Sequence, residues 1–372
     1  MYRILGESRY YEYEGKNKDR DFVNTIDSIF VVWVLGCCGR LEAIIMIKDK
    51  VSIIIPTFRG EETVARAVKS ALEQDYDSIE VIVVDDNEPN SEHRIETEKQ
   101  LGSFLKNNQI QLIKHDSNMN GSVARNTGAR VASGEYLSFL DDDDEYLPTR
   151  ISKSIDRAKE DRTDLVFSNV LVKKNNKPLR LINVKEVDDW FLETLMNENI
   201  IGTGSNLFVK KKIYDELGGF DENLVRNQDV EFLLNAFSKD AIAVCINEIL
   251  VIKHENDELH VPSYGEMCSI KQYLKAKYNT FISAYSIETV RAIVDRAHRS
   301  LLKTAIQNKN QEGIYTEKEM LVNKLSIKEL VEIAMVKNTE LSFLRKIYDK
   351  YRAIKISSIL LLSKLYPWKW TE

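Results

Sequence analysis

Short apolar runs alternate with amphipathic segments along the middle of the chain, and this alternation most limits what the chain can fold into. Val51–Pro56 and Val81–Val84 are β-branched runs of strand length. Between them, apolar residues from Val64 to Leu72 recur at the spacing of one helix face. Strands that alternate with helices are typical of a parallel sheet built from βαβ units. The sequence therefore predicts an α/β fold.

The alternation continues to about residue 255, after which strand-like runs disappear and helical segments follow. We expect an N-terminal extension over residues 1–50, a sheet domain over residues 51–255 and a helical C-terminal region over residues 256–372. The other elements expected in the sheet domain are strands at Gln111–Lys114, Tyr136–Leu140, Asp164–Val172 and Asn206–Val209, two short strands within Ile242–Ile252, and helices at Gly121–Ser133, Ile151–Ala158, Lys210–Leu217 and Asp229–Phe237.

Composition narrows the class of protein. The 372 residues are 43% apolar, which supplies a full-sized core and excludes a disordered chain. With 52 basic and 58 acidic residues the net charge is −6, which predicts no nucleic-acid partner. The four cysteines show neither a disulfide framework nor zinc-ligand spacing, so we expect a reducing, cytoplasmic compartment. The first 20 residues are too polar for a signal peptide, and no early apolar run approaches the ~18 residues that span a bilayer.

Acidic residues gather where strands of the predicted sheet end. Asp85–Asp86 follow one strand and Asp141–Asp144 follow another, while Thr57 closes the first. Open parallel sheets bind ligands at the carboxyl ends of their strands, so these side chains are expected to share one crevice. Carboxylate oxygens suit Mg²⁺ and Mn²⁺, which makes the aspartate run a candidate metal site. The alternative for the run is a solvated acidic turn.

An acidic pair after a buried strand is also typical of phosphoacceptor receiver domains, where the acids hold magnesium. In those domains the pair closes the first strand. Here the strand Val51–Pro56 precedes Asp85–Asp86, and the next acidic strand end is the run Asp141–Asp144 rather than a single aspartate. The order of the segments therefore disfavours a receiver domain.

Five segments follow one another in order along the sheet domain: Val51–Thr57, Val81–Asp86, Gly121–Gly128, Gly134–Asp144 with Pro148, and Gly218–Glu222 followed by Asn227–Asp229. Taken together, these segments resemble the family-2 glycosyltransferases of bacterial polysaccharide biosynthesis, over roughly residues 51–255. The resemblance implies a GT-A fold with a Rossmann-like sheet, a nucleotide-sugar donor, a divalent metal (Mn²⁺ or Mg²⁺) and inversion at the anomeric carbon.

The resemblance implies a role for each matching residue on the donor side. Pro56, Thr57, Arg125 and Asp142 would lie at the nucleotide, and Asp86 would accept a hydrogen bond from the imide N–H of uracil.

The metal ligands implied by the resemblance are Asp141 and Asp143, the two acids of a D-x-D pair, with Asp143 bridging to the diphosphate. Asp142 or Asp144 are alternatives that would share the ion. His254 follows the last strand of the domain, where related enzymes often place a histidine near the diphosphate, and the resemblance makes it a third candidate metal ligand. Its alternative is a surface or capped histidine.

Asp229 would be the general base that takes the proton of the incoming hydroxyl. The family usually has an acid before it, and this chain has Gln228. That departure keeps Asp221 and Glu231 as alternative bases, and an ordinary helix N-terminal acid as an alternative for Asp229. It also favours the alternative function, a catalytically inactive subunit of GT-A fold that binds nucleotide or carbohydrate.

Acceptor-side candidates are Trp190, Gly204 and Asp221, because aromatic rings stack on sugars and glycine permits close approach. Core packing is an equal alternative for Trp190. The expected acceptor is a glycan or a lipid-linked saccharide.

The last residues, 341–372, combine seven basic residues with apolar ones and end near Trp368 and Trp370. This pattern is typical of a helix on a membrane surface, which would place the protein on the inner face of the cell membrane. The alternatives are packing on its own domain or on a second copy of the chain in a homo-oligomer.

Overall fold

The computed structural model describes residues 29–35, 41–160, 163–197, 199–255 and 262–322, together with Leu325 and Glu329. The basic segment 341–372 lies outside the described residues, so its proposed membrane contact stays a prediction. None of the described helices is both long and apolar enough to cross a membrane. The chain divides into two compact units. One comprises residues 1–172, 181–191 and 199–254, and the other, the helical unit, comprises residues 173–180, 192–198 and 255–372.

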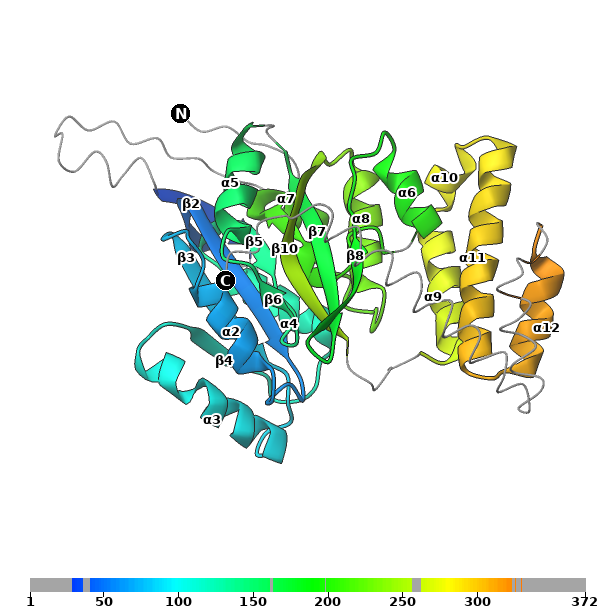
Figure 1. Ribbon diagram of the computed structural model, residues 1–372. Coiled ribbons are helices and arrows are strands. Elements are labelled where there is room, and N and C mark those ends of the chain that lie inside the picture. The colour runs from blue at the N-terminus through cyan, green and yellow to red at the C-terminus, as the bar shows by residue number, and fades with distance from the viewer. Residues whose placement is uncertain are drawn as a thin grey trace, which may run out of the picture. The chain divides into compact units, whose positions relative to one another are not determined.

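The described strands form one mixed sheet, in the order β4-β3-β2-β5-β9-β7-β10-β6, with β1 beside β2 and β8 beside β7 (Figure 1). The strands are β1 (Ile29–Leu35), β2 (Leu41–Thr57), β3 (Ile79–Asp85), β4 (Gln111–Lys114), β5 (Gly134–Phe139), β6 (Glu145–Tyr146), β7 (Leu165–Lys174), β8 (Lys177–Ile182), β9 (Phe208–Lys210) and β10 (Ala243–Glu255). The helices among them are α2 (Val64–Leu72), α3 (Glu92–Lys106), α4 (Gly121–Val131), α5 (Arg150–Glu160), α6 (Trp190–Asn197), the 3₁₀ helix Gly204–Asn206, α7 (Lys211–Leu217) and α8 (Gln228–Phe237).

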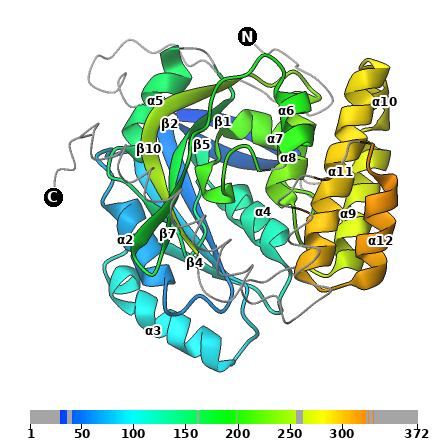
Figure 2. The same cartoon turned by 45° about the vertical axis from the view of Figure 1, so that its right-hand side comes forward.

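Alternate residues of β2 face opposite layers of helices. Val51, Ile53 and Ile55 pack in one buried cluster with α2, α3 and α5. Ile54 faces the other way, and its side chain lies so close to Gly128 of α4 that a Cβ there would come within 2.5 Å of it. Figure 2 shows α2, α3 and α5 on one side of the sheet and α4, α7 and α8 on the other. The lack of a side chain at Gly128 thus permits close packing of α4 on the sheet.

The parallel register brings the predicted site residues to one edge of the sheet. Thr57 at the end of β2 pairs with Asp85 at the end of β3. On the other side of β2, Ile54 pairs with Phe139, and Leu140 N donates to Ile54 O at 3.0 Å. The aspartate run that follows Leu140 therefore begins beside the ends of β2 and β3, and the predicted meeting of strand ends is confirmed.

Several elements differ from the prediction. The span 242–252 predicts two short strands, but β10 is a single strand whose middle residues Asn247 and Glu248 are exposed. Strand β8, for which the sequence predicted no element, begins after a turn at Asn175–Asn176. The strand predicted at Asn206–Val209 begins two residues later, because the 3₁₀ helix includes Asn206. The sheet also includes β1 and the first ten residues of β2, which the sequence places in the N-terminal extension.

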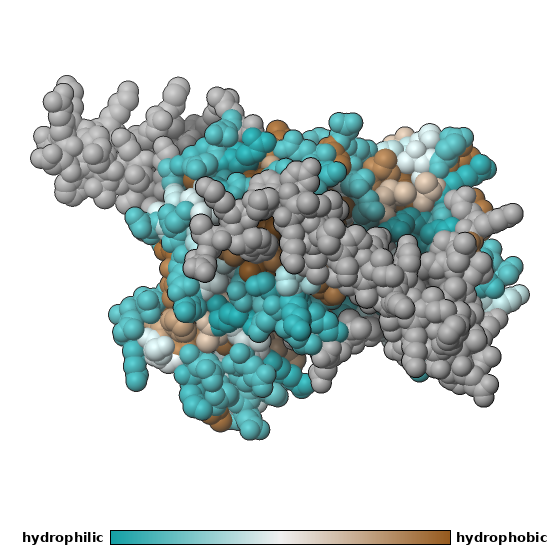
Figure 3. Space-filling view, in the orientation of Figure 1, coloured by the Kyte–Doolittle hydropathy of each residue, from teal (hydrophilic) through white to brown (hydrophobic). Residues whose placement is uncertain are grey.

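Several helices begin or end at residues that are typical of helix caps. Ser91 accepts a hydrogen bond from Arg94 N and begins α3, and Asn120 accepts from Ser122 N and Val123 N and begins α4. Gly218 ends α7 with a positive φ of 84°, the conformation that favours glycine. The predicted end of this helix at Leu217 is therefore confirmed. In Figure 3 the surface over α2 and α3 is largely hydrophilic, as expected for the outer face of a helical layer.

The helical unit contains α9 (Tyr264–Lys277), α10 (Asn279–Ser283), α11 (Ile287–Gln307) and α12 (Gln311–Met320). A capping box between Ser263 and Glu266 begins α9. Leu302, Ala305 and Ile314 form a small buried cluster between α11 and α12. The C-terminal helical region predicted from the sequence is present.

Candidate functional site

A cavity of about 240 Å³ lies at the strand ends. Its lining joins the ends of β2 and β3, the first turns of α4 and the aspartate run. All five predicted nucleotide residues and both acids of the D-x-D pair line it. The lining residues are Pro56, Thr57, Phe58, Asp86, Gly121, Ala124, Arg125, Asp141, Asp142 and Asp143.

A second cavity, of about 170 Å³, shares Arg125 and Asp141 with the first. It contains the predicted base, Asp229, and the predicted acceptor residue Gly204. The two cavities therefore meet at one pair of side chains. The other residues that line the second cavity are Asn199, Thr203, Phe220, Asn227, Gln228 and Lys253.

Arg125 and Asp141 form an ion pair, with Nη2 and Oδ1 2.5 Å apart. Burial opposes the charge on Asp141, but Arg125 outweighs it and holds the pKa of that carboxyl below its usual value. Arg125 Nη1 donates to Gln228 Oε1 at 2.8 Å, and the guanidinium lies over the Phe220 ring at 5.6 Å. Gln228 is thus a neutral second partner of Arg125, and the arginine has no second carboxylate at this position.

The remaining three aspartates of the run are crowded. Burial raises the pKa of Asp142 to about 7, and its neighbours Asp143 and Asp141 add to the shift. Burial raises the pKa of Asp144 to about 8, although Thr203 and Ser205 donate their hydroxyls to its Oδ2 at 2.9 and 2.6 Å. Burial and Asp141 also raise the pKa of Asp143. The run thus concentrates negative charge that the protein neutralises only in part.

This donor set suits a hard divalent cation. The Asp143 carboxylate accepts no hydrogen bond from another residue in the described part of the chain, and it lines the first cavity. The described residues contain no group of three or more acidic, histidine or cysteine side chains arranged as metal ligands. Mg²⁺ is usually held by one or two carboxylates together with substrate phosphates, so a site with few protein ligands fits such an ion.

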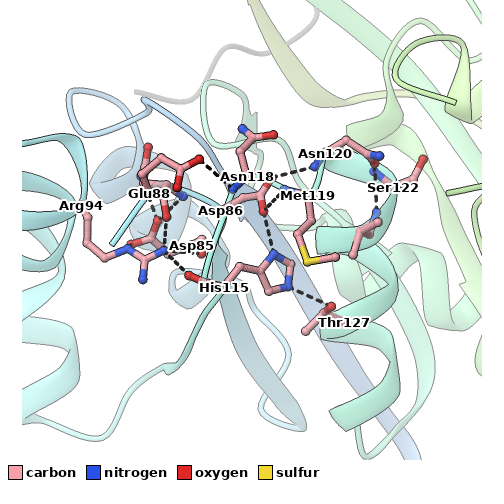
Figure 4. Close-up of polar contacts among 12 residues, drawn as sticks. Asp85, Asp86, Glu88, Arg94, His115, Asn118, Met119, Asn120, Ser122 and Thr127 are labelled. Carbon is pink, nitrogen blue, oxygen red and sulfur yellow. Dashed lines mark hydrogen bonds and ion pairs between the residues drawn. The ribbon is translucent and has the colours of Figure 1, made fainter. Parts of the chain in front are cut away.

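Asp86 is almost fully buried and is surrounded by hydrogen-bond donors (Figure 4). His115 Nδ1 lies 2.7 Å from its Oδ1, Met119 N donates to the same oxygen at 2.9 Å, and Asn120 N donates to Oδ2 at 3.0 Å. The backbone N–H of Asp86 donates to Thr57 O at 2.9 Å. The position of this carboxylate is therefore fixed by β2, by the segment after β4 and by the start of α4.

Arg94 of α3 holds the segments on either side of Asp86 and the backbone of His115. Its guanidinium donates to the carbonyls of Asp85, Asn87 and His115, and Nε lies 3.2 Å from Asp85 Oδ2. Both side chains of this ion pair are at least nine-tenths buried. Burial still raises the pKa of Asp85, against the opposing effects of the Asn87 hydrogen bonds and of Arg94.

Asp229 is the second residue of α8 and is partly buried. Its Oδ1 accepts a hydrogen bond from Val230 N at 2.9 Å. Burial raises its pKa, while Lys253 and Arg125 oppose the shift. A carboxylate with a raised pKa is a stronger base than an exposed one, which suits proton abstraction.

The other predicted residues lie outside both cavity linings. His254 Nε2 is 2.8 Å from Glu145 Oε1, so its role as a metal ligand stays a prediction. Trp190 lies against Phe167 and Phe237, with ring centroids 5.5 and 5.6 Å away, as the core-packing alternative expects.

Asp221 accepts hydrogen bonds from the backbone N–H and the side chain of Asn223 in a turn. Its acceptor role, like that of Trp190, stays a prediction.

Two further residues were not predicted. Lys253 lines the second cavity, and its charge favours the ionised forms of Asp141 and Asp229. Asn126 uses its whole side-chain amide, since Oδ1 accepts from Tyr214 Oη and Phe220 N and Nδ2 donates to Phe220 O and Glu222 Oε1. It thereby holds the segment that leads to Asp229 against α4. Asn126 lies next to Arg125 in the segment Gly121–Gly128, but the family resemblance assigns a role to Arg125 alone.

Residues 52–218 match the family model described as glycosyl transferase family 2. The amylovoran biosynthesis glycosyltransferase AmsB of Erwinia amylovora is 26% identical over 196 residues, which are 50% of this chain and 63% of AmsB. The E. coli UDP-Glc:alpha-D-GlcNAc-diphosphoundecaprenol beta-1,3-glucosyltransferase WfaP is 32% identical over 127 residues, which are 34% of this chain and 48% of WfaP. The chain thus spans less than two thirds of the length of these relatives.

Among solved structures, S. aureus TarS 1-349 superposes with a TM-score of 0.52 at 16% identity, covering 87% of this chain and 93% of that one. The same fragment in complex with UDP-GlcNAc gives a TM-score of 0.51 at 17% identity, covering 77% of this chain and 79% of that one. At this identity the likeness shows the fold alone. The expected GT-A fold is confirmed.

Proposed function

We propose that the protein is a family-2 glycosyltransferase, because residues 52–218 match the model of that family, and that it transfers a sugar from a nucleotide-sugar donor, UDP-linked, to a saccharide acceptor with inversion at the anomeric carbon. The observation that carries the proposal is the pair of cavities that meet at Arg125 and Asp141. One contains the D-x-D acids and the other contains a carboxylate able to act as a base. Donor and acceptor would therefore approach each other across this ion pair.

The first cavity is proposed to hold the nucleoside diphosphate. Thr57 and Asp86 lie at the ends of neighbouring strands, as do the base-recognising groups of sheet proteins that bind nucleotides at this edge. Arg125 already pairs with Asp141, so its charge is oriented along the wall where the diphosphate would lie. The relatives that support a UDP-sugar are WfaP, whose name includes UDP-Glc, and TarS, whose crystal contains UDP-GlcNAc.

Asp143 and Asp141 are proposed to hold the divalent metal, Mn²⁺ or Mg²⁺. When bound, the ion would supply positive charge to the diphosphate as it leaves. Burial, together with the neighbouring carboxylates, raises the pKa of Asp142, Asp143 and Asp144, and this supports the assignment, because a cation among these carboxylates would favour their charged forms.

Asp229 is proposed to take the proton from the acceptor hydroxyl. An inverting transfer needs the base on the face of the sugar opposite the leaving group, as in inverting glycoside hydrolysis. The second cavity meets this need because Asp229 lines it and it shares one wall with the first. Lys253 in the same cavity would help keep the base charged before transfer.

The finer identity of the acceptor is supported by one relative only. The name of WfaP gives a sugar linked to diphosphoundecaprenol as its acceptor. We propose a lipid-linked saccharide as the acceptor class to try first. A protein on the inner face of the membrane would meet such an acceptor, and residues 341–372 are the proposed contact.

The test is a donor screen followed by transfer. UDP-sugars and other nucleotide sugars are incubated with the full chain, Mn²⁺ and short lipid-linked saccharides, and products are followed by mass spectrometry and by NMR of the anomeric proton. We expect a product of inverted configuration from a UDP-sugar, and no product after EDTA treatment. Metal-dependent UDP binding without product from any acceptor would instead support an inactive binding subunit.

Asp229→Asn separates the base from the donor site. We expect transfer to be abolished while the affinity for UDP, measured by calorimetry with Mn²⁺, stays within a factor of about two. Asp221→Asn is the matched control, because Asp221 is the alternative base and lies outside both cavity linings. Loss of UDP binding in Asp229→Asn would move this residue to the donor side.

A further inference from the structure

His115 is a buried histidine that the sequence comparison leaves without a role. It follows β4 and is 9% exposed. Nδ1 lies 2.7 Å from Asp86 Oδ1, and Nε2 lies 3.0 Å from Thr127 Oγ1 of α4 (Figure 4). An ionised carboxylate only accepts hydrogen bonds, so the proton must lie on Nδ1. The Thr127 hydroxyl can then donate to Nε2, which completes a chain from α4 through the imidazole to Asp86.

The hydrogen bonds leave Asp86 with one open acceptor position. A carboxylate offers about four lone-pair positions, two on each oxygen. Oδ1 accepts from His115 Nδ1 and Met119 N, and Oδ2 accepts from Asn120 N. No other donor to this carboxylate occurs in the part of the chain that the structure describes. Oδ1 is therefore saturated, and the remaining position is on Oδ2.

One open position distinguishes between nucleobases by the donors on their pairing edges. Uracil presents a single imide N–H between two carbonyl oxygens. Guanine presents two adjacent donors, the ring N–H and the amino group, which bind best to both oxygens of a free carboxylate at once. An Asp86 with a saturated Oδ1 can accept the uracil N–H but cannot form the two-oxygen contact with guanine.

We infer that His115 is a specificity-determining residue that, by occupying Oδ1 of Asp86, makes the donor site select uridine over guanosine nucleotides. The inference rests on the proposed function, because it needs Asp86 to face the base of a bound nucleotide. His115 does not contact the nucleotide; it acts through Asp86. The nucleotides that the donor site accepts are therefore narrowed from nucleoside diphosphates in general to those whose base has a single N–H on its pairing edge.

The experiment compares UDP with GDP. Dissociation constants of both are measured by calorimetry with Mn²⁺ for the unmodified chain, His115→Leu and His115→Asn. We expect the unmodified chain to prefer UDP. In His115→Leu one of the two acceptor positions of Oδ1 is freed while Met119 N keeps the other, and the ratio of UDP to GDP affinity should fall by about tenfold, the size of one hydrogen bond to a charged group.

His115→Asn is the rescue variant, because its side-chain N–H can still donate to Oδ1, and it should retain most of the preference. His93→Leu is the matched control. His93 Nδ1 lies 2.7 Å from Glu61 Oε1, the same type of pair, but outside the first cavity lining. Its removal should leave the affinity ratio unchanged. Thermal unfolding of each variant identifies any that fail to fold. If His115→Leu does not fold, the UDP-to-GDP affinity ratio of His115→Asn tests the inference.

Two outcomes overturn the inference, and they differ in what else they affect. If the unmodified chain prefers UDP and both His115 variants keep the same ratio, His115 does not set the preference, and the proposed function stands. If the unmodified chain binds neither UDP nor GDP, the proposed function fails as well.

Discussion

Two carboxylates at the same edge of the sheet have opposite surroundings. Asp86, after β3, accepts three hydrogen bonds from groups of the protein itself. Asp143, after β5, lies among three other aspartates, and burial and Asp141 raise its pKa. Both line the first cavity. The difference supports the two tasks proposed above, since a carboxylate with fixed donors is suited to recognising one further N–H, whereas crowded carboxylates are suited to binding a cation.

The largest expected effect comes from removing the crowded carboxylate. Asp143→Ala should lower the transfer rate by about 10³-fold, because the leaving diphosphate loses the charge of the proposed metal. Asp86→Asn should instead weaken UDP binding and leave the rate at saturating donor largely unchanged. Initial rates at a range of donor concentrations, with Mn²⁺ and with EDTA, separate the two. An Asp143→Ala variant that is as active as the unmodified chain would remove the metal assignment.

The second prediction concerns Arg94, whose hydrogen bonds hold the backbone on both sides of Asp86. Arg94→Leu leaves Asp85 buried without its ion pair and removes donors from the carbonyls of Asn87 and His115. Loss of one partner of a buried pair typically costs about 3 kcal/mol or more. Urea unfolding measures the change in the free energy of unfolding. Arg130→Leu is the matched control, because the Arg130–Glu222 pair is well exposed, and it should cost about 0.5 kcal/mol or less.

Gly60 tests how tightly the crowded aspartates are held. A Cβ at Gly60 would lie 1.8 Å from Asp142 Oδ2, so Gly60→Ala must displace that carboxyl. We expect a loss of about 1–3 kcal/mol in the free energy of unfolding, together with weaker metal-dependent UDP binding. Gly102→Ala is the control, because its Cβ would meet nothing within 4 Å and its helix α3 favours alanine. Equal behaviour of the two variants would mean that the Asp142 carboxyl moves aside freely.

The sequence was informative where a pattern repeats. Short apolar runs predicted β2, β3 and β5, and parallel pairing brought Thr57, Asp86 and the aspartate run to one cavity. It was uninformative where contacts join distant segments. A single histidine carries no periodicity, so nothing in the sequence indicates that His115 binds Asp86. Helix α3 was not predicted, because its core-facing side includes the charged Arg94 and few apolar residues.

The same limit explains the error in β10. The exposed residues Asn247 and Glu248 interrupt the apolar pattern of that strand, so one strand was expected as two. Its backbone pairing with β6 extends over Val251 and Ile252, and such pairing depends on the partner strand rather than on the local pattern. Lys253 was overlooked for a related reason, because only the fold brings it to the cavity that contains Asp229.

The smallest expected effect concerns Glu80, a carboxylate at the start of β3 that accepts several hydrogen bonds from the protein. Burial alone would raise its pKa, but hydrogen bonds from Ser52, Lys50 and Ser133 outweigh burial and lower the pKa from its ordinary 4.5. The stability that Glu80 contributes is therefore fully present above pH 4.5 and is lost as the pH falls through the lowered folded-state pKa.

Glu80→Gln should cost about 1 kcal/mol at neutral pH and flatten this acid dependence, measured by urea unfolding at pH values from neutral to acid. Glu96→Gln, on the exposed face of α3, is the control and should leave the stability at neutral pH nearly unchanged. If Glu80→Gln also leaves the pH dependence of the free energy of unfolding unchanged, hydrogen bonds from the protein are not enough to hold a carboxylate in its charged form. The contrast between Asp86 and Asp143 would then need another explanation.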